Sequence, residues 1–315
     1  MKTASFSFPS GTGRHTLHGV CWKPEGTVRA VVQISHGMVE YIERYEPLAA
    51  YLTGKGILVV GHDHVGHGRS VTGPEEWGHF GVKDGGRTLV EDLHTLTVRL
   101  RRQYPDTPLF LLGHSMGSFV ARRYMMTYGA DIDGAIVMGT GNQPTYQLLA
   151  GQALTAVLTM LHGENYRSPL MARLLFGRSN RRVPHPRTEN DWLTKDAAIV
   201  DRYSRDPACS FRFTLNGYAN LFALIRFVKR PANIAAIPAG LPVILMAGED
   251  DPVGNYGRAV RKVYTVWKKQ GLTDLELKLY PNDRHELVNE TDRESVFQDI
   301  EHWLERHLPA RPTKG

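Results

Sequence analysis

The sequence predicts an α/β fold: a mostly parallel sheet of eight strands, with helices on both faces and a helical cap insertion. Three observations lead to this prediction. Short, continuous apolar runs recur along the chain, amphipathic segments separate them, and one long stretch contains no such run. Continuous apolar runs are typical of strands that are buried on both faces, as in parallel sheets. Strands that alternate with helices form an open parallel sheet covered on both sides.

The predicted strands begin with an antiparallel hairpin. Residues 5–8 and 15–22 are joined by a Ser-Gly-Thr-Gly turn, which is typical of such a hairpin. The continuous apolar runs that follow predict parallel strands. These strands are expected at 30–37, 57–63, 108–113, 135–141, 242–248 and 275–280.

Amphipathic segments between the strands predict the helices that cover the sheet. One apolar face and one polar face are typical of a helix that packs against a core. These helices are expected at 44–56, at 87–104, after Met116, at 257–271 and at 293–308.

The stretch from 142 to 238 has no clear strand. It contains helical segments at 145–162, 168–177 and 214–229, with Pro and Arg between them. A loop of that length without secondary structure is improbable in a compact protein. We therefore expect a core formed by residues 1–141 and 239–315, and a helical cap formed by residues 142–238 that covers one end of the sheet.

Composition excludes several classes of protein. The net charge is +6 and the isoelectric point is about 9.3, but the Lys and Arg residues are dispersed, which argues against nucleic-acid binding. The two cysteines, Cys21 and Cys209, are far apart and lack CxxC spacing, so neither a disulfide framework nor a thiol metal site is indicated. No apolar run reaches the length of a signal peptide or a membrane span. We expect a cytoplasmic protein, and the sequence leaves its oligomeric state open.

The strongest motif is the G-x-S-x-G of Gly113, Ser115 and Gly117, which lies between a predicted strand and a predicted helix. The turn between them must be so tight that the serine adopts a strained backbone, and the two glycines leave room for the neighbouring elements. Such a turn places the Ser115 hydroxyl at the carboxyl end of the sheet and at the start of a helix, where free N–H groups favour an anion. We predict that Ser115 is a nucleophile.

A serine nucleophile needs a base to accept its proton and a carboxylate to orient that base. His285 follows the last predicted strand, and Glu249, Asp250 and Asp251 follow the strand before it. The order Ser, Asp, His, with each residue at the end of a successive strand, is the one that this architecture requires. Asp251, which precedes Pro-Val, is the preferred acid, and Asp250 is the alternative.

The oxyanion of the transition state needs two hydrogen-bond donors. The backbone N–H of Met116, the residue after the nucleophile, is expected to be one of them. The loop after strand 30–37 contains His36-Gly37-Met38, and its glycine lets the N–H of Met38 face inward as the second donor. Each such donor typically contributes several kcal/mol in the transition state.

The stretch GHDHVGHGRS raises the alternative of a metal site, because His62, Asp63, His64 and His67 fall within it. A hydrolytic zinc site of the H-x-H-x-D-H type needs an aspartate two residues after the second histidine, and Gly66 stands there. No further histidine pair or carboxylate follows at a convincing spacing. We therefore predict no metal and no cofactor, and we expect Asp63 to accept hydrogen bonds from backbone N–H groups of its own turn.

Together the motifs HGMVE, GHDHVGHGRS, GHSMG, GTG, DDPVG and a late RHE resemble those of the α/β-hydrolase superfamily, specifically its monoacylglycerol lipase and lysophospholipase branch. The resemblance covers nearly the whole chain, because DWLTKDAAIVDRYSRDPACSFRFTLNGY is similar to the cap segment of bacterial members. It implies a serine esterase with Ser115, Asp251 and His285 as its triad and Met38 and Met116 as its oxyanion donors. It also implies that the D-x-x-G-H-G-x-S turn does not bind metal. Instead, the turn supports the loop of residues 36–40 that carries Met38, which we call the oxyanion loop.

One position departs from the branch. Its members commonly have a His-Ser pair after the glutamate of HGxxE, whereas Glu40 is followed here by Tyr41 and Ile42. The role of Glu40 beyond shaping the loop is therefore left open.

The insertion gives the only indication of the substrate. Its segment YQLLAGQALTAVLTML is apolar around much of its circumference, so that it either packs within the cap or faces an acyl chain, and it allows transient contact with a membrane surface. Together with the resemblance, this favours an ester with a medium or long acyl chain and a small polar head, such as a monoacylglycerol or a lysophospholipid.

Three alternatives remain on the same fold. An aminopeptidase would need acidic cap residues to bind a substrate ammonium, and Glu164, Glu189, Asp191 and Asp201 are available. An acyltransferase would transfer the acyl group to an alcohol instead of water. A non-catalytic protein would bind a ligand without turnover. The fold alone does not select among these functions.

Overall fold

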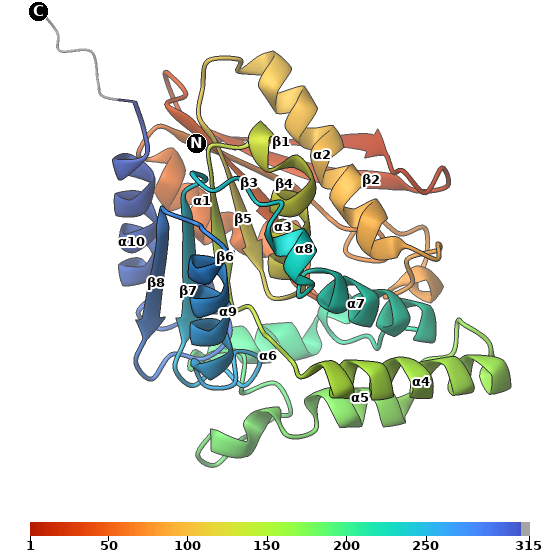
Figure 1. The fold of residues 1–315 in the computed structure, drawn as a ribbon. Coiled ribbons are helices and arrows are strands. Elements are labelled where there is room, and N and C mark those ends of the chain that lie inside the picture. The colour runs from red at the N-terminus through yellow and green to blue at the C-terminus, as the bar shows by residue number, and fades with distance from the viewer. Residues whose placement is uncertain (310–315) are drawn as a thin grey trace, which may run out of the picture.

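A single eight-stranded sheet organises the computed structural model, which describes residues 1–309 (Figure 1). The strands lie in the order β1-β2-β4-β3-β5-β6-β7-β8. The prediction of an eight-stranded, mostly parallel sheet is confirmed. The strands are β1 (Lys2–Pro9), β2 (Thr16–Lys23), β3 (Ala30–Ser35), β4 (Ile57–His62), β5 (Leu109–His114), β6 (Gly134–Met138), β7 (Val243–Gly248) and β8 (Leu275–Tyr280).

The direction of the strands brings the predicted site residues to one edge. β1 and β2 form the antiparallel hairpin, β2 is also antiparallel to β4, and all further pairs are parallel. The register pairs Ser35 of β3 with Gly113 of β5, and Gly113 with Val137 of β6. The carboxyl ends of these strands therefore meet at one edge, which is where open α/β sheets bind their ligands.

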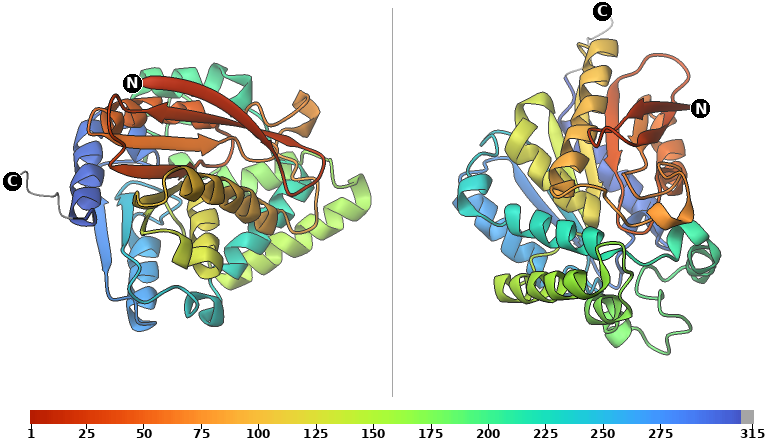
Figure 2. Two further views of the ribbon diagram at one scale, coloured as in Figure 1. Left: turned by 90° about the horizontal axis from the view of Figure 1, so that it is seen from above. Right: turned by 90° about the vertical axis from the view of Figure 1, so that its right-hand side faces the viewer.

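Helices cover both faces of the sheet, as the amphipathic segments predicted (Figure 2). On one face, the core includes Leu48 of α1 and Trp303 of α10. On the other face, it includes Leu93 of α2, Tyr124 of α3 and Trp267 of α9. The covering helices are α1 (Glu46–Thr53), α2 (Gly85–Gln103), α3 (Met116–Tyr128), α9 (Arg258–Lys269) and α10 (Arg293–Arg306).

The chain between β6 and β7 is helical. In Figures 1 and 2, α4 and α5 lie side by side at the margin of the molecule, with α7 between α4 and the rest of the chain. α7 also packs on α2 and α3, so this part of the insertion is joined to the core. The helices are α4 (Thr145–His162), α5 (Pro169–Phe176), α6 (Ala197–Arg205), α7 (Leu215–Phe227) and α8 (Pro231–Ile234).

Element boundaries differ from the predicted ones where the backbone turns. The strand expected at 135–141 ends at Met138, because Gly139 has a φ of +60° and leaves the extended conformation. The sequence analysis did not predict α6, a short helix whose Asp196 caps it by accepting the N–H groups of Ala198 and Ile199. Within residues 1–309, no helix is both long enough and apolar enough to cross a bilayer.

Candidate active site

Ser115 lies in the sharp turn between β5 and α3. Its backbone has φ 52° and ψ −116°, a conformation that is strained for a residue with a side chain. The two glycines of the motif are needed for close packing. A Cβ atom on Gly117 would lie 2.0 Å from the carbonyl oxygen of Ser35, and a Cβ on Gly113 would lie 2.4 Å from the carbonyl oxygen of Gly117. The turn therefore holds the serine at the carboxyl end of the sheet.

The structure brings Ser115, His285 and Asp251 together. The Ser115 Oγ lies 2.8 Å from His285 Nε2, and His285 Nδ1 lies 3.0 Å from Asp251 Oδ1. Asp251 is fully buried, and its Oδ1 also accepts the N–H of Val253 at 2.8 Å. The alternative acid, Asp250, has an exposed side chain. This arrangement can deprotonate the serine through an imidazole whose tautomer is fixed by a carboxylate.

The two residues expected to supply oxyanion donors border the same cavity as Ser115. Met38 follows β3, Met116 begins α3, and both line the cavity. Gly37 approaches so closely that a Cβ there would lie 3.1 Å from the Cβ of Ser115. The N–H of Gly37 donates to Glu40 Oε1 at 2.5 Å, which fixes the loop that carries Met38.

Glu40 is the centre of a buried network that the sequence analysis left open. Its carboxylate accepts hydrogen bonds from Tyr45 Oη at 3.0 Å, His114 Nδ1 at 3.1 Å and Arg44 Nη1 at 2.9 Å. Arg44 also forms a bidentate ion pair with Glu286, at 2.8 and 2.6 Å. Burial alone would lower the pKa of His114, but its hydrogen bond to Glu40 and the charge of that carboxylate outweigh burial and raise the pKa.

This network connects the two loops that flank Ser115. His114 precedes the serine, bonds through Nδ1 to Glu40 of the oxyanion loop, and donates through Nε2 to the carbonyl oxygen of His285 at 3.2 Å. His114 and Arg44 were not predicted as site residues from the sequence. A local signal existed for Arg44, because it stands four residues after Glu40, the spacing of an ion pair on one face of a helix.

Residues 192–194 of the insertion contact the loop that carries His285. The ring of Trp192 lies 5.0 Å from the imidazole of His285. The carbonyl oxygen of Leu193 accepts the N–H of Glu286 at 2.7 Å, and Arg284 Nη1 donates to the carbonyl oxygen of Thr194 at 2.9 Å. No local pattern predicts these contacts, because they join segments that are distant in the sequence.

A large cavity opens from Ser115. Its volume is about 1440 Å³, and both the sheet edge and the insertion line it. Phe119 of α3, Leu148 of α4, and Leu221 and Phe222 of α7 supply apolar walls, while polar side chains line the remainder. The cavity has room for an acyl chain together with a polar head group.

The histidines of the GHDHVGHGRS turn are buried, and His64 and His67 bond to separate neighbours. His64 Nε2 lies 2.9 Å from Ser35 Oγ, the N–H of His64 donates to His36 Nε2 at 2.9 Å, and His67 Nδ1 donates to the carbonyl oxygen of Val65 at 3.1 Å. Burial lowers the pKa of His67 to about 4, and that of His36 to about 3. These rings pack under the oxyanion loop as neutral groups, and their nitrogens do not converge on one point.

The carboxylate of Asp63 bonds to backbone groups and not to these histidines. Its Oδ1 accepts the N–H of Ile42 and its Oδ2 accepts the N–H of Arg69, both at 2.8 Å. The expected hydrogen bond to the backbone of its own turn is confirmed by Arg69. The bond to Ile42 additionally ties the turn to the segment after the oxyanion loop.

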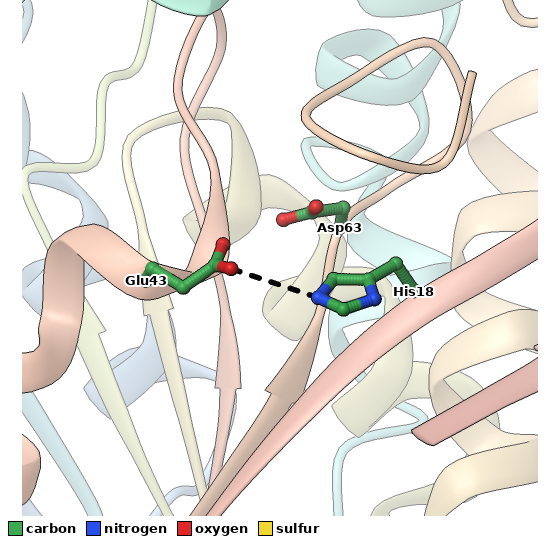
Figure 3. A group of neighbouring side chains, drawn as sticks. All are labelled: His18, Glu43 and Asp63. Atoms are coloured by element: carbon green, nitrogen blue, oxygen red, sulfur yellow. Dashed lines mark ion pairs between the residues drawn. The ribbon is translucent and has the colours of Figure 1, made fainter. Parts of the chain in front are cut away.

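Asp63 instead gathers with His18 and Glu43, as Figure 3 shows. The three side chains are close enough to share a metal ion. However, both oxygens of Asp63 already accept backbone N–H groups, and Glu43 Oε1 pairs with His18 Nε2 at 3.6 Å and with Arg69 Nη1 at 3.2 Å. Ion pairs and backbone bonds thus account for most contacts of this group, although within residues 1–309 Glu43 Oε2 has no hydrogen-bond partner.

The fold and the buried Ser-His-Asp arrangement together define a class. A mostly parallel eight-stranded sheet with a serine at the turn after β5, and an acid and a histidine after β7 and β8, is the architecture of the α/β-hydrolases. The protein is a serine hydrolase of this superfamily. More particularly, residues 26–292 match the model of the family described as serine aminopeptidase, S33, and the chain belongs to this family.

Several similar proteins are lipases or esterases. The chain is 29% identical to monoglyceride lipase of Mus musculus over 298 residues, which cover 92% of this chain and 86% of that protein. It is 28% identical to monoacylglycerol lipase of Mycolicibacterium smegmatis over 314 residues, with coverage of 96% and 97%. A crystal structure of a thermostable carboxyl esterase from Bacillus coagulans in complex with glycerol superposes with a TM-score of 0.89 at 31% identity, covering 97% of this chain and 99% of that one. The expected membership of the monoacylglycerol lipase branch is confirmed.

Proposed function

We propose that this protein hydrolyses carboxylic esters that carry an acyl chain and a small polar head, of the monoacylglycerol or lysophospholipid type. The observation that carries the proposal is the hydrogen-bonded series of Ser115, His285 and Asp251 beside a large, partly apolar cavity. The similarity to monoacylglycerol lipases and to a carboxyl esterase supports the choice of an ester over an amide.

In the proposed mechanism, Ser115 Oγ attacks the ester carbonyl while His285 Nε2 accepts its proton. The carbonyl oxygen becomes an oxyanion, which the backbone N–H groups of Met38 and Met116 stabilise. His285 then donates the proton to the leaving alcohol, and the acyl group remains on the serine. Water attacks this acyl-enzyme with His285 again as the base, and the fatty acid leaves. Asp251 holds the imidazole in the required tautomer, and no step needs a metal or a cofactor.

Residues 142–238 act as a lid in this proposal. Several large apolar side chains of α4 and α5 are exposed, whereas on α4 only Leu148 and Thr155 are buried. An exposed apolar surface beside a cavity for acyl chains supports transient contact with a membrane surface, from which the substrate would be taken. Within residues 142–238, the exposed large apolar side chains are Tyr146, Leu149, Val157, Met160, Leu161, Tyr166, Leu170, Leu174 and Leu175.

Cysteine chemistry supports a cytoplasmic location. Cys21 and Cys209 are not joined in a disulfide. Reduced, unpaired cysteines are the ordinary state in the cytosol.

The geometry disfavours an aminopeptidase. Of the four acidic residues that could bind a substrate ammonium, Glu189 alone lines the cavity. Asp201 pairs with Arg187 at 3.0 Å, Asp191 accepts hydrogen bonds from Thr188 Oγ1 and the Arg187 N–H, and Glu164 accepts from Asn216. A substrate ammonium would therefore meet one free carboxylate. Acyl transfer and binding without turnover have no comparable support from a specific contact.

The proposal is tested by turnover of p-nitrophenyl esters of increasing chain length, 1-monoacylglycerol, lysophosphatidylcholine and an aminoacyl anilide. We expect turnover that peaks with medium or long acyl esters and falls about 10⁴-fold or more in Ser115→Ala. Ser210→Ala is the matched control, because Ser210 also lines the cavity and is exposed. Preferred cleavage of the anilide, or full turnover in Ser115→Ala, would refute the proposed function.

A further inference from the structure

The segment between α4 and α6 concentrates positive charge. Residues 165–188 contain six arginines and no aspartate or glutamate, so the dispersal of basic residues that holds for the rest of the chain fails here. The segment includes α5 and the short 3-10 helix η4 (Ser179–Arg182). Charge of one sign in a continuous stretch is unfavourable by self-repulsion unless a ligand or partner offsets it.

Most of these arginines line the cavity that contains Ser115. The lining has six arginines, three glutamates and no lysine or aspartate. Two of the glutamates, Glu40 and Glu286, are already paired with Arg44, which lies outside the lining. The arginines that line the cavity are Arg167, Arg173, Arg178, Arg181, Arg187 and Arg212.

Three of them, Arg173, Arg178 and Arg181, form what we call the arginine lip. Their side chains are exposed, and within the described part of the chain no carboxylate pairs with them. By contrast, Arg187 pairs with Asp201, and Arg167 donates to the carbonyl oxygens of Glu75 and Arg212. The lip, together with the exposed Arg212, is thus the part of the cavity wall whose guanidinium groups pair with no carboxylate among the described residues.

A guanidinium group binds phosphate and carboxylate with two parallel hydrogen bonds, and an excess of positive charge around a partly enclosed cavity raises the local concentration of anions. Leu174 and Leu175 of α5 lie between Arg173 and Arg178 in the sequence and also line the cavity, so side chains suited to an acyl chain are flanked by guanidinium groups suited to an anion. A neutral glycerol head would leave these guanidinium groups without an ionic partner.

We propose that the arginine lip selects acyl esters whose own head group is anionic, a phosphate or carboxylate, over esters with a neutral head. This inference rests on the proposed esterase function and specifies its substrate class. The anion belongs to the substrate itself, because the lip lines the same cavity as Ser115.

The test compares two soluble esters with the same acyl chain, 1-octanoylglycerol and 1-octanoylglycerol 3-phosphate, both kept monomeric and without vesicles. We expect the wild-type kcat/KM to favour the phosphate by about tenfold at low salt. Raising the ionic strength to about 0.5 M should reduce that preference severalfold, because the Debye length falls to a few ångströms.

The variant Arg173→Gln/Arg178→Gln/Arg181→Gln should lower the phosphate-to-neutral ratio of kcat/KM about tenfold. The control variant Arg14→Gln/Arg102→Gln/Arg230→Gln removes the same charge from exposed positions outside the cavity lining, and its ratio should match the wild type. Circular dichroism establishes that both variants are folded. If the triple lip variant were poorly folded, Arg178→Gln/Arg181→Gln, with both changes at exposed positions of the η4 turn, replaces it.

Equal kcat/KM for the two esters in the wild type overturns the inference and leaves the esterase proposal intact. So does the same fall in ratio for the lip and control variants. A preference that appears only after vesicles of phosphatidylglycerol are added assigns the lip to membrane docking and also overturns it. Turnover of neither ester by folded wild type refutes the proposed function together with the inference.

Discussion

Two regions near the active site distribute their side chains in opposite ways. The GHDHVGHGRS turn buries polar groups: His62, His64 and His67 are fully shielded from solvent, as is His36, which packs against them. The α4–α5 pair instead exposes apolar groups, with Met160 at 79% and Leu161 at 69% exposure. The surrounding fold covers the buried histidines. Within residues 1–309, nothing covers the apolar side chains of Met160 and Leu161.

The comparison shows that the usual distribution, with apolar side chains buried and polar ones exposed, is reversed in elements around the active site. Burying an imidazole costs free energy unless its nitrogens find partners, and within residues 1–309 neither ring nitrogen of His62 has one. Exposing Met and Leu on a helix surface likewise costs solvation free energy. Both costs occur in elements that border the active site: the histidines pack under the oxyanion loop, and α4 and α5 each contribute side chains to the cavity. Local exceptions to the usual pattern are expected at functional sites.

The largest effect is expected at the buried Asp251, whose neighbour in the sequence, Asp250, is exposed. Asp251→Asn should lower kcat for an acyl ester about 10⁴-fold, because the amide cannot hold His285 in the required tautomer. Asp250→Asn, at the exposed neighbouring position, should change kcat less than about threefold. Steady-state kinetics on one p-nitrophenyl ester measures both variants. The reverse ranking would assign the acid to Asp250 and remove Asp251 from the mechanism.

An intermediate effect is expected from acid, and it tests whether the histidine turn is held neutral. Burial lowers the pKa of His62 to about 3, below its unfolded value of about 6.5, so the unfolded chain binds more protons between these values. The free energy of unfolding should therefore be greatest above pH 6.5 and fall as the pH decreases towards 3. By pH 5 the loss should reach about 2 kcal/mol from His62 alone.

His62→Leu should remove that part of the pH dependence, since a leucine side chain binds no proton. Urea unfolding at pH 7.5 and pH 5 measures the difference for the variant and the wild type. The exposed His302→Leu is the matched control. An equal loss of stability between the two pH values in His62→Leu and wild type would show that the pKa of His62 is not lowered in the folded protein.

The smallest effect is expected at the exposed apolar helices. Met160→Ser/Leu161→Ser should weaken sedimentation with phospholipid vesicles about tenfold, because two side chains no longer transfer to the lipid interface. The thermal midpoint should hardly change, since these side chains are exposed in the folded protein. Unchanged vesicle binding would exclude this part of α4 from membrane contact. A large fall in the midpoint would mean that the helices are packed rather than free.

The sequence by itself determined the order and type of the elements around the site. Continuous apolar runs located the strands, because a strand buried on both faces admits few polar residues, and the G-x-S-x-G glycines located the turn, because a Cβ at Gly117 would overlap the backbone of β3. Ser115, Asp251 and His285 could be chosen for the same reason: in a parallel sheet, successive strand ends meet at one edge, so linear order predicts proximity.

Only the tertiary structure decided which partners the buried polar groups would take. The contact of Trp192 with His285, the link from Glu40 through His114 to the loop of His285, and the turning of Asp63 towards His18 and Glu43 join segments that are distant in the chain. The choice among such partners depends on which side chains the packing of the elements leaves within hydrogen-bond reach. Periodicity and local motifs do not indicate which side chains from distant segments will lie within that reach.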